Sequence, residues 1–176
     1  MLPVVSLVGR SNSGKTTLVE KLVRELKGRG YRVGTVKHHA HGEEVDRPGK
    51  DSWRHAEGGA EVVAVSSPRG LAVFRRVERE LSLGEIVGLL EGLVRVGLVK
   101  IDLILTEGYK REGWPKIEVI DPAVCPEPLC GKEDNLLAVA CDRPLETGVP
   151  CFRRDDARGL ADLIEEGFLK GRVEGP

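Results

Sequence analysis

The chain has 176 residues, a length that favours one domain spanning residues 1–176 with a core of its own. Its 27 Lys and Arg residues nearly balance its 28 Asp and Glu residues, and the formal net charge of −1 argues against an overall basic field for nucleic acid or a membrane surface. We find neither a signal-peptide pattern nor an apolar run of membrane-spanning length, so we expect a cytoplasmic protein without nucleic-acid or membrane partners.

The first predicted elements are a strand, a loop and a helix. Residues 4–8 form an almost uninterrupted apolar run of strand length, and Leu18 and Leu22 belong to a helical repeat further on. Between them, the spacing G-x-x-x-x-G-K-T from Gly9 to Thr16 is that of a phosphate-binding loop. All three segments therefore indicate the same kind of nucleotide site.

Each position of this loop has a physical role. Gly9 and Gly14 let backbone N–H groups turn inward around a phosphate, and the N-terminus of the helix adds donors and the positive end of its dipole. Lys15 supplies charge to the outer phosphates, the Thr16 hydroxyl suits Mg²⁺, and Thr17 is left for an inner phosphate. The predicted phosphate-binding residues are Gly9, Arg10, Ser11, Asn12, Ser13, Gly14, Lys15, Thr16 and Thr17.

A second strand, a polar loop and a short helix come next. The strand is predicted to end at Lys37 or His38, and residues 39–50 carry glycine, proline and charge without an apolar period. The short helix follows, with Asp51 or Ser52 as its expected cap. The polar loop is a candidate switch segment.

Residues 61–77 are predicted to form an insertion at the edge of the sheet. Two strand-like runs are separated by a short turn signal, which is typical of an antiparallel hairpin. A helix is expected after Ser82, and a buried strand then delivers Glu107 at its carboxyl end.

The remaining chain continues the alternation of strands and helices. We expect a strand over residues 115–121, a surface excursion over about residues 122–135, another strand from Leu136 and an amphipathic C-terminal helix. The pattern predicts an α/β fold, a three-layer sandwich of the P-loop NTPase type whose mostly parallel sheet carries an antiparallel edge hairpin.

Three carboxylates are candidates for metal chemistry. Glu107 follows a buried strand, where it reaches Mg²⁺ directly or through water, or simply ends the strand in solvent. One of Asp46 and Asp51 is placed to approach the metal or orient a water, although loop solvation or helix capping explains them equally well. Lys15, Thr16 and Glu107, together with one of the two aspartates, are therefore the candidates for catalysis and metal binding.

Two further clusters allow more than one interpretation. At the end of the second strand, a group that can meet phosphates or hold a metal consists of Lys37, His38, His39 and His41. The four cysteines, Cys125, Cys130, Cys141 and Cys151, are interpreted as small buried hydrophobes rather than disulfides, with a zinc site as the alternative.

The last polar features concern arginines and the base of a nucleotide. The pairs Arg75-Arg76 and Arg153-Arg154 are interpreted as solvated faces. Of the N-K-x-D motif that selects guanine in many switch proteins, only Asp142 is present. It reads guanine or opens a turn before Pro144, and the sequence favours neither.

Three blocks together resemble a known family: GRSNSGKTTL, then TVKHHAHGEEVDRPGKDSWRHAEGGA, then LILTEGYKREGWPKIEV. They are similar to the molybdopterin-guanine dinucleotide biosynthesis adaptor proteins, the MobB family. The middle block is the specific one, with K-H-x-x-H, D-x-x-G-K-D-S and a nearby G-A. The likeness spans about residues 4–142.

This resemblance implies a homodimer, joined with the help of the hairpin, that binds GTP with Mg²⁺ and hydrolyses it slowly if at all. It also implies a role assisting the molybdenum cofactor guanylyltransferase, which attaches GMP to molybdopterin. In this sequence Asp46 and Glu107 would face the metal, so the residues assigned to metal binding are Thr16, Asp46 and Glu107, and those assigned to catalysis are Lys15, Asp46 and Glu107. The residues implied to line the same pocket are Lys37, His38, Lys50 and Asp51.

Two other functions remain open. An ATP-dependent small-molecule kinase or ligase would need an acceptor pocket, for which Lys110, Arg111 and the segment around Trp114 are the candidates. A metal-handling module would instead use the histidines and cysteines, with the phosphate loop driving delivery.

Overall fold

The computed structural model describes residues 1–39 and 46–170, which pack as two compact units. The first consists of Met1–His38 and Leu83–Pro176, and the second of His39–Ser82. Each unit is described by itself below. The expectation that residues 1–176 form one domain stays a prediction.

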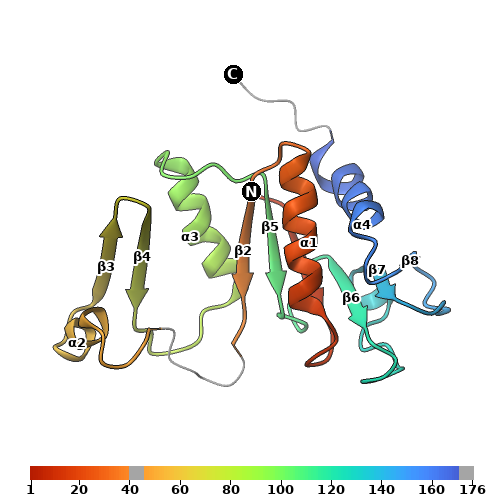
Figure 1. Cartoon of the computed structure of the whole chain (residues 1–176), viewed down its shortest axis with the longest axis horizontal. Helices are drawn as coiled ribbons and strands as arrows, with labels where there is room; N and C mark the ends of the chain where they lie inside the picture. Colours follow the sequence, from red (N-terminus) through yellow and green to blue (C-terminus); the bar gives the residue numbers. More distant parts are fainter. Residues whose placement is uncertain (40–45, 171–176) are drawn as a thin grey trace. The chain divides into compact units, whose positions relative to one another are not determined.

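The first unit is built on a six-stranded sheet in the order β2-β5-β1-β6-β7-β8 (Figure 1). All of its strand pairs are parallel. The strands are β1 (Val4–Val8), β2 (Val33–Lys37), β5 (Leu103–Glu107), β6 (Lys116–Ile120), β7 (Leu136–Cys141) and β8 (Cys151–Phe152). Because parallel strands end at the same edge, the loops after β1, β2, β5, β6, β7 and β8 share one side of the sheet.

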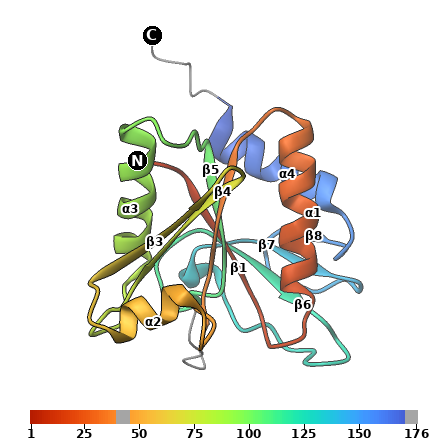
Figure 2. The same cartoon turned by 60° about the vertical axis from the view of Figure 1, so that its left-hand side comes forward.

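Helices cover both faces of this sheet. Helices α1 (Lys15–Gly28) and α4 (Ala157–Ile164, continued by a π-helical turn over Glu165–Leu169) lie on one face, and α3 (Leu83–Arg95) lies on the other (Figure 2). The alternation of side chains along β1 explains the two layers, since Val5 and Leu7 pack with α1 and α4 while Val4 packs with α3. This arrangement confirms the predicted α/β sandwich.

The second unit contains α2 (Asp51–Glu57) and the antiparallel hairpin of β3 (Val62–Ser67) and β4 (Gly70–Arg75). The hairpin is confirmed, but its strands pair with each other as a sheet of their own rather than with the six-stranded sheet. The predicted helix cap was wrong: the N-cap position is Lys50, and no side chain caps the helix. Asp51 already lies inside the first turn, where its negative charge suits the helix dipole.

Two buried charged side chains of β6 hold the excursion over residues 122–135. The Lys116 ammonium donates to the carbonyl oxygens of Glu112, Trp114 and Asp134 at 2.5, 3.0 and 2.7 Å. The Glu118 carboxylate accepts from the N–H groups of Leu129 and Cys130. Both side chains are 1% exposed, and burial raises the pKa of Glu118.

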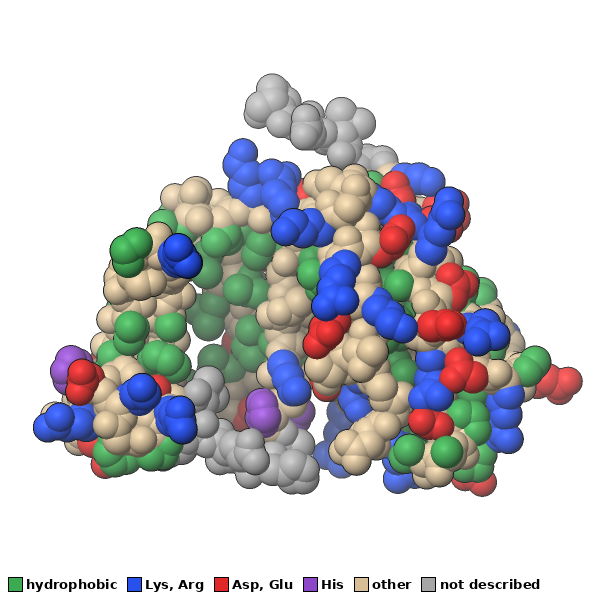
Figure 3. Space-filling model, viewed as in Figure 1, with side chains coloured by type: hydrophobic (Ala, Val, Ile, Leu, Met, Phe, Trp, Pro, Cys, Tyr) green, Lys and Arg blue, Asp and Glu red, His purple; other side chains and the backbone are tan. Residues whose placement is uncertain are grey.

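The strand β8 was not predicted, because two residues are too short to show a period. Among the described helices, none has the length and apolar content needed to cross a membrane. Positive and negative side chains are interspersed over α1 and α4, in keeping with the nearly neutral charge (Figure 3).

Candidate functional site

The loop between β1 and α1 has the backbone that its glycines predict. Gly9, Asn12 and Gly14 have φ values of 145°, 61° and 96°. A Cβ atom at Gly9 would collide with the carbonyl oxygen of Val119 on the neighbouring strand, so this turn requires glycine. The strand, the loop and the helix therefore follow one another as the motif requires.

The N-terminus of α1 is open toward the loop. Its N-cap is Gly14, no side chain caps it, and its first turn carries no acidic residue. The first N–H groups of a helix have no acceptor within the helix, and the dipole places partial positive charge there. This end of a 14-residue helix is therefore suited to an anion.

Lys15 lies over the loop. Its ammonium donates to the Arg10 carbonyl oxygen at 2.6 Å. Burial lowers the pKa of Lys15, with the Glu107 carboxylate opposing that shift and the Lys37 ammonium adding to it. The lysine is thus held within the loop by a neutral carbonyl, a partner that an incoming phosphate oxygen can replace.

Thr16 and Glu107 come together although they are far apart in sequence. The Thr16 hydroxyl donates to the Glu107 carboxylate, with 2.9 Å to each oxygen. The pairing of β1 with β5 causes this meeting, since the two strands end side by side. The Lys37 ammonium at the end of β2 lies 3.9 Å from the same carboxylate.

The Thr16 and Glu107 oxygens suit a magnesium ion. Mg²⁺ prefers oxygen donors, and proteins commonly hold it through one or two side chains together with the phosphates of a nucleotide. A hydroxyl and a carboxylate at the N-terminus of a phosphate-binding helix provide this donor set. The third predicted metal ligand, Asp46, belongs to the other unit.

His38 is placed beside Glu107 by the end of β2. Its backbone N–H donates to the Glu107 carbonyl oxygen at 3.0 Å, and its ring lies 5.0 Å from that of Tyr109. Gly108 has φ of 102°, and a Cβ atom there would approach the His38 Cβ to 2.9 Å. The structure thus brings Lys37, His38 and Glu107 to one edge of the sheet.

The other predicted site residues lie in the second unit. One Asp46 carboxylate oxygen accepts from the Arg47 N–H at 2.8 Å, and the other is buried without a hydrogen-bond partner in the described chain. The Asp51 carboxylate is 91% exposed and lies 3.9 Å from the Arg54 guanidinium. Lys50 and Asp51 line a hollow of about 440 Å³ between α2 and β3. Their approach to the phosphate loop stays a prediction.

The described residues do not support the two alternative metal sites, one formed by the histidines and one by the cysteines. The part of the chain from 1 to 39 and 46 to 170 contains no group of three or more His, Cys, Asp or Glu side chains arranged for a metal, and His41 lies outside it. All four cysteines are free thiols. Cys130 and Cys141 are buried as predicted, whereas the prediction was wrong for the exposed Cys151.

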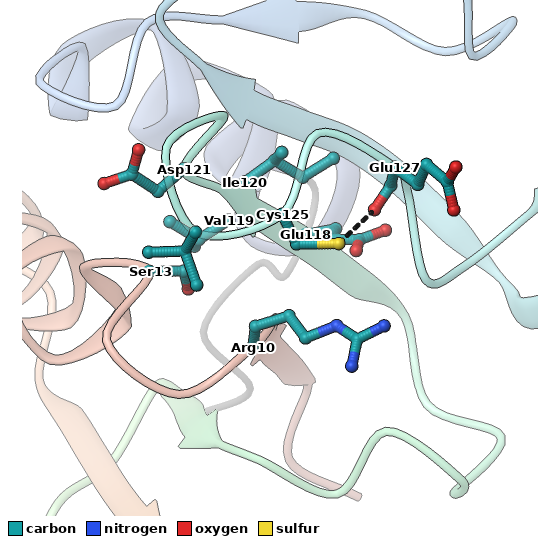
Figure 4. Close-up of a pocket in the computed structure, with 9 residues that line it drawn as sticks. Arg10, Ser13, Glu118, Val119, Ile120, Asp121, Cys125 and Glu127 are labelled. Atoms are coloured by element: carbon teal, nitrogen blue, oxygen red, sulfur yellow. Dashed lines mark hydrogen bonds between the residues drawn. The ribbon is translucent and has the colours of Figure 1, made fainter.

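A narrow hollow lies behind the phosphate loop, between Arg10 and Ser13 and the chain that follows β6 (Figure 4). The Ser13 hydroxyl is buried and has no hydrogen-bond partner among the described residues. The Arg10 side chain extends along the edge of the hollow, facing Glu118 and Cys125. The Asp121 carboxylate points away from this hollow.

Sequence reasoning missed one cluster beside the loop. The Arg154 guanidinium donates to the Asp121 carboxylate at 2.6 Å, to the Asp142 carboxylate at 2.8 Å and to the Ser13 carbonyl oxygen at 3.4 Å. The interpretation of Arg154 as part of a solvated face was therefore wrong, because this side chain is 29% exposed whereas that of Arg153 is 74% exposed. Two adjacent arginines gave no local signal that separated them.

Comparison with known proteins gives a consistent result. A model of the family described as "Molybdopterin guanine dinucleotide synthesis protein B" matches residues 4–142. A molybdopterin-guanine dinucleotide biosynthesis adapter protein of Escherichia coli is 36% identical over 174 residues, which cover 97% of this chain and 95% of the relative. The corresponding protein of Haemophilus influenzae is 35% identical over 164 residues, or 93% and 88% of the two chains.

Solved structures agree with these sequence matches. A crystal structure of Bacillus subtilis MobB superimposes with a TM-score of 0.73 at 28% identity, covering 96% of this chain and 99% of that one. A crystal structure of a molybdopterin-guanine biosynthesis protein B gives a TM-score of 0.67 at 34% identity, covering 93% and 98%.

Proposed function

The chain belongs to the molybdopterin guanine dinucleotide synthesis protein B family, and on that premise we propose that it is an adapter which works by binding GTP with Mg²⁺. Its place as an adapter in molybdopterin guanine dinucleotide biosynthesis follows from the family. The nucleotide, the metal, the slow hydrolysis and the partners are the proposal.

Binding of a triphosphate is supported most directly by the uncapped N-terminus of α1 below the Gly9–Thr16 loop. The N–H groups of its first turn and the Lys15 ammonium both lie at this loop, and a polyanion offers acceptors to both. Lys15 would exchange the Arg10 carbonyl for a phosphate oxygen. This exchange replaces a neutral acceptor by a charged one, which strengthens the hydrogen bond.

Thr16 and Glu107 are the residues that would hold Mg²⁺. A bound Mg²⁺ supplies neutralisation of phosphate charge. Lys37 lies on the same side and contributes further positive charge near the outer phosphates. Asp46, whose buried carboxylate oxygen has no partner in the described chain, is proposed to join this group when the nucleotide is bound.

We propose that hydrolysis is slow. The segment from residue 39 to 49 contains no arginine other than Arg47 that could stabilise transition-state charge. Hydrolysis without such an arginine is typically slower by about a thousandfold or more. A long-lived nucleotide complex suits an adapter, because the ordered loop around Asp46 then presents a stable surface to a partner.

The proposed partners are the guanylyltransferase that attaches GMP to molybdopterin and a second copy of this chain. The hairpin supports the homodimer. Val62, Leu71 and Val73 share one face of β3 and β4 and are 53%, 63% and 58% exposed. A two-stranded hairpin with an uncovered apolar face is marginally stable in water, so it gains by being covered.

Replacement of Lys15 tests the nucleotide site. The Lys15→Ala protein should bind GTP roughly 10- to 100-fold more weakly than wild type, because a charged hydrogen bond to phosphate is lost. Calorimetric titration with GTP and Mg²⁺ measures this. Lys27→Ala, on an exposed position at the far end of the same helix, is the matched control and should bind as wild type does.

Undiminished GTP binding by the Lys15→Ala protein would contradict the site. The same preparation also tests the alternative kinase or ligase, since rapid phosphorylation of an added acceptor would favour that function. Adapter activity is tested by molybdopterin guanine dinucleotide formation with the purified transferase, where wild type should raise the yield and the Lys15→Ala protein should not.

A further inference from the structure

Arg154 connects three segments that end at the same edge of the sheet. Asp121 follows β6, Asp142 follows β7, and Arg154 itself follows β8. The guanidinium bonds to both carboxylates and to the Ser13 carbonyl oxygen, and the Arg154 backbone N–H also donates to Asp142 at 3.1 Å. One side chain therefore joins the phosphate loop to the ends of three strands.

The cluster lies where the nucleoside end of a bound nucleotide would be expected. This step rests on the proposed function. Lys37 and Glu107, which suit the outer phosphates and the metal, end β2 and β5 on one side of β1, and Thr16 at the start of α1 bonds to Glu107 there. The strands β6, β7 and β8 lie on the other side of β1. A triphosphate held across the loop would direct its nucleoside toward Asp121, Asp142 and Arg154.

Asp142 is the member of the cluster that a ligand can reach. Its side chain is 41% exposed, against 22% for that of Asp121. Hydrogen bonds from Arg154 lower the pKa of Asp142, so the carboxyl group is ionised at neutral pH and acts only as an acceptor. A carboxylate has about four lone-pair sites, which leaves room for a ligand beside Arg154.

A hollow of about 160 Å³ opens beside Asp142. Apolar and positively charged residues line it together with Asp142: Pro144, Phe152, Cys141, Cys151, Arg143 and Arg153. Apolar surface with a small number of polar groups is typical of ligand sites, and both aromatic rings and guanidinium planes stack on bases. The hollow and the carboxylate together make a place for the base.

The chemistry of the two purines distinguishes them at such a carboxylate. Guanine presents two adjacent donors, the N1–H and the exocyclic amine, whereas adenine presents an acceptor at N1. An acceptor-only group gains hydrogen bonds with the first and faces a lone pair with the second. We propose that Asp142, held in position by Arg154, accepts hydrogen bonds from guanine and so selects GTP over ATP.

Arg154 acts here as a positioning residue. It fixes the Asp142 carboxylate through two donors and ties this orientation to the phosphate loop through Ser13. The base and the phosphates are thus held by one connected set of hydrogen bonds.

The test uses the full chain with Mg²⁺ and a GTP analogue fluorescently labelled on its ribose, displaced by GTP, ATP, inosine triphosphate or xanthosine triphosphate. Wild type should prefer GTP to ATP by roughly 5- to 150-fold, the discrimination of one bidentate base contact. Inosine triphosphate, which lacks the exocyclic amine, should bind between the two.

The near-isosteric Asp142→Asn change should remove this preference through loss of GTP affinity. It should also improve binding of xanthosine triphosphate, whose C2 carbonyl can accept from the new amide, and a merely structural defect would not produce that gain. Arg154→Ala should reduce the GTP-to-ATP ratio in the same way, and Arg154→Lys should restore part of it. Arg24→Ala, at an exposed arginine of α1 that does not line this hollow, should change nothing.

The outcomes separate the two proposals. If wild type binds none of these nucleotides, the proposed function fails. If wild type binds GTP but binds ATP equally well, or if Asp142→Asn keeps the full preference, the inference about Asp142 and Arg154 is overturned while nucleotide binding stands. Thermal unfolding of each variant checks that Arg154→Ala is folded, and the Asp142→Asn result decides the question if it is not.

Discussion

Gly9 is the residue at which β1 turns into the phosphate loop, and it tolerates no side chain. Its φ of 145° lies in a region that favours glycine, and a Cβ atom would collide with the carbonyl oxygen of Val119 and approach the Ser13 hydroxyl to 2.9 Å. We expect Gly9→Ala to lower the free energy of unfolding by roughly 2–4 kcal/mol, because strain and a backbone collision add together.

Urea unfolding measures this loss, and Gly28→Ala is the control. Gly28 ends α1, and a Cβ atom there would meet nothing within 4 Å. Because alanine favours the helix, the control should be as stable as wild type or more stable by about 0.5–1 kcal/mol. Equal stability of both variants would show that the tight approach of the loop to β6 is not required.

At the scale of elements, the start of β2 is tied to the start of β5 by one ion pair. The Asp102 carboxylate accepts from the backbone N–H, the Nε and the Nη2 of Arg32 at 2.7–2.9 Å. These bonds, the side-chain ones first, lower the pKa of Asp102 below its usual 3.8. A lowered pKa in the folded state means that the ionised carboxylate stabilises the fold above about pH 4.

Asp102→Asn should therefore be less stable than wild type at pH 7, by up to about 1 kcal/mol because solvent screens the pair. The difference should shrink as the pH falls from 3.8 through the lowered pKa, since wild type then loses the charge too. Chemical denaturation over a series of pH values measures it.

The excursion over residues 122–135 protects a thiol. Cys130 is 6% exposed, and burial, with the nearby Glu118 charge, raises the pKa of its thiol to about 11. In the folded protein at pH 7.5, iodoacetamide should modify the exposed Cys151 first and leave Cys130 unmodified. Peptide mass spectrometry checks the order, and modification of Cys130 as fast as Cys151 would show that the excursion opens readily.

At the scale of the whole molecule, the hairpin is the surface through which we propose that two copies of the chain associate. The double change Leu71→Glu and Val73→Glu places charge on its exposed face and should convert the proposed homodimer to a monomer. Light scattering coupled to size exclusion measures the mass. Val124→Glu, at an isolated exposed apolar residue of the excursion, should leave the dimer intact. A monomeric wild-type protein would contradict the dimer.

The elements that could be predicted are those with a local signal. The apolar run of β1, the helical repeat of α1 and the turn between β3 and β4 each lie within a short stretch of chain. β6 was also predicted, but not its full burial. The buried Glu118 carboxylate accepts from backbone groups 11 and 12 positions away, and one of the three acceptors of Lys116 is 18 positions away, which no local pattern shows.

The candidate site divides in the same way. The spacing of Gly9, Gly14, Lys15 and Thr16 identified a phosphate loop, because a turn and a helix N-terminus are local structures. The role of Asp142 remained open, and Arg154 was assigned to solvent, because their meeting depends on β6, β7 and β8 lying side by side.

The sequence by itself therefore determined the phosphate loop, the alternation of strands and helices and the family, since each rests on residues that are neighbours along the chain. Only the tertiary structure decided which distant side chains share the edge of the sheet. Thr16 meets Glu107 across 91 positions, and Arg154 meets Ser13 across 141. The physical reason is that parallel strands bring their carboxyl ends together in an order set by packing of the whole sheet.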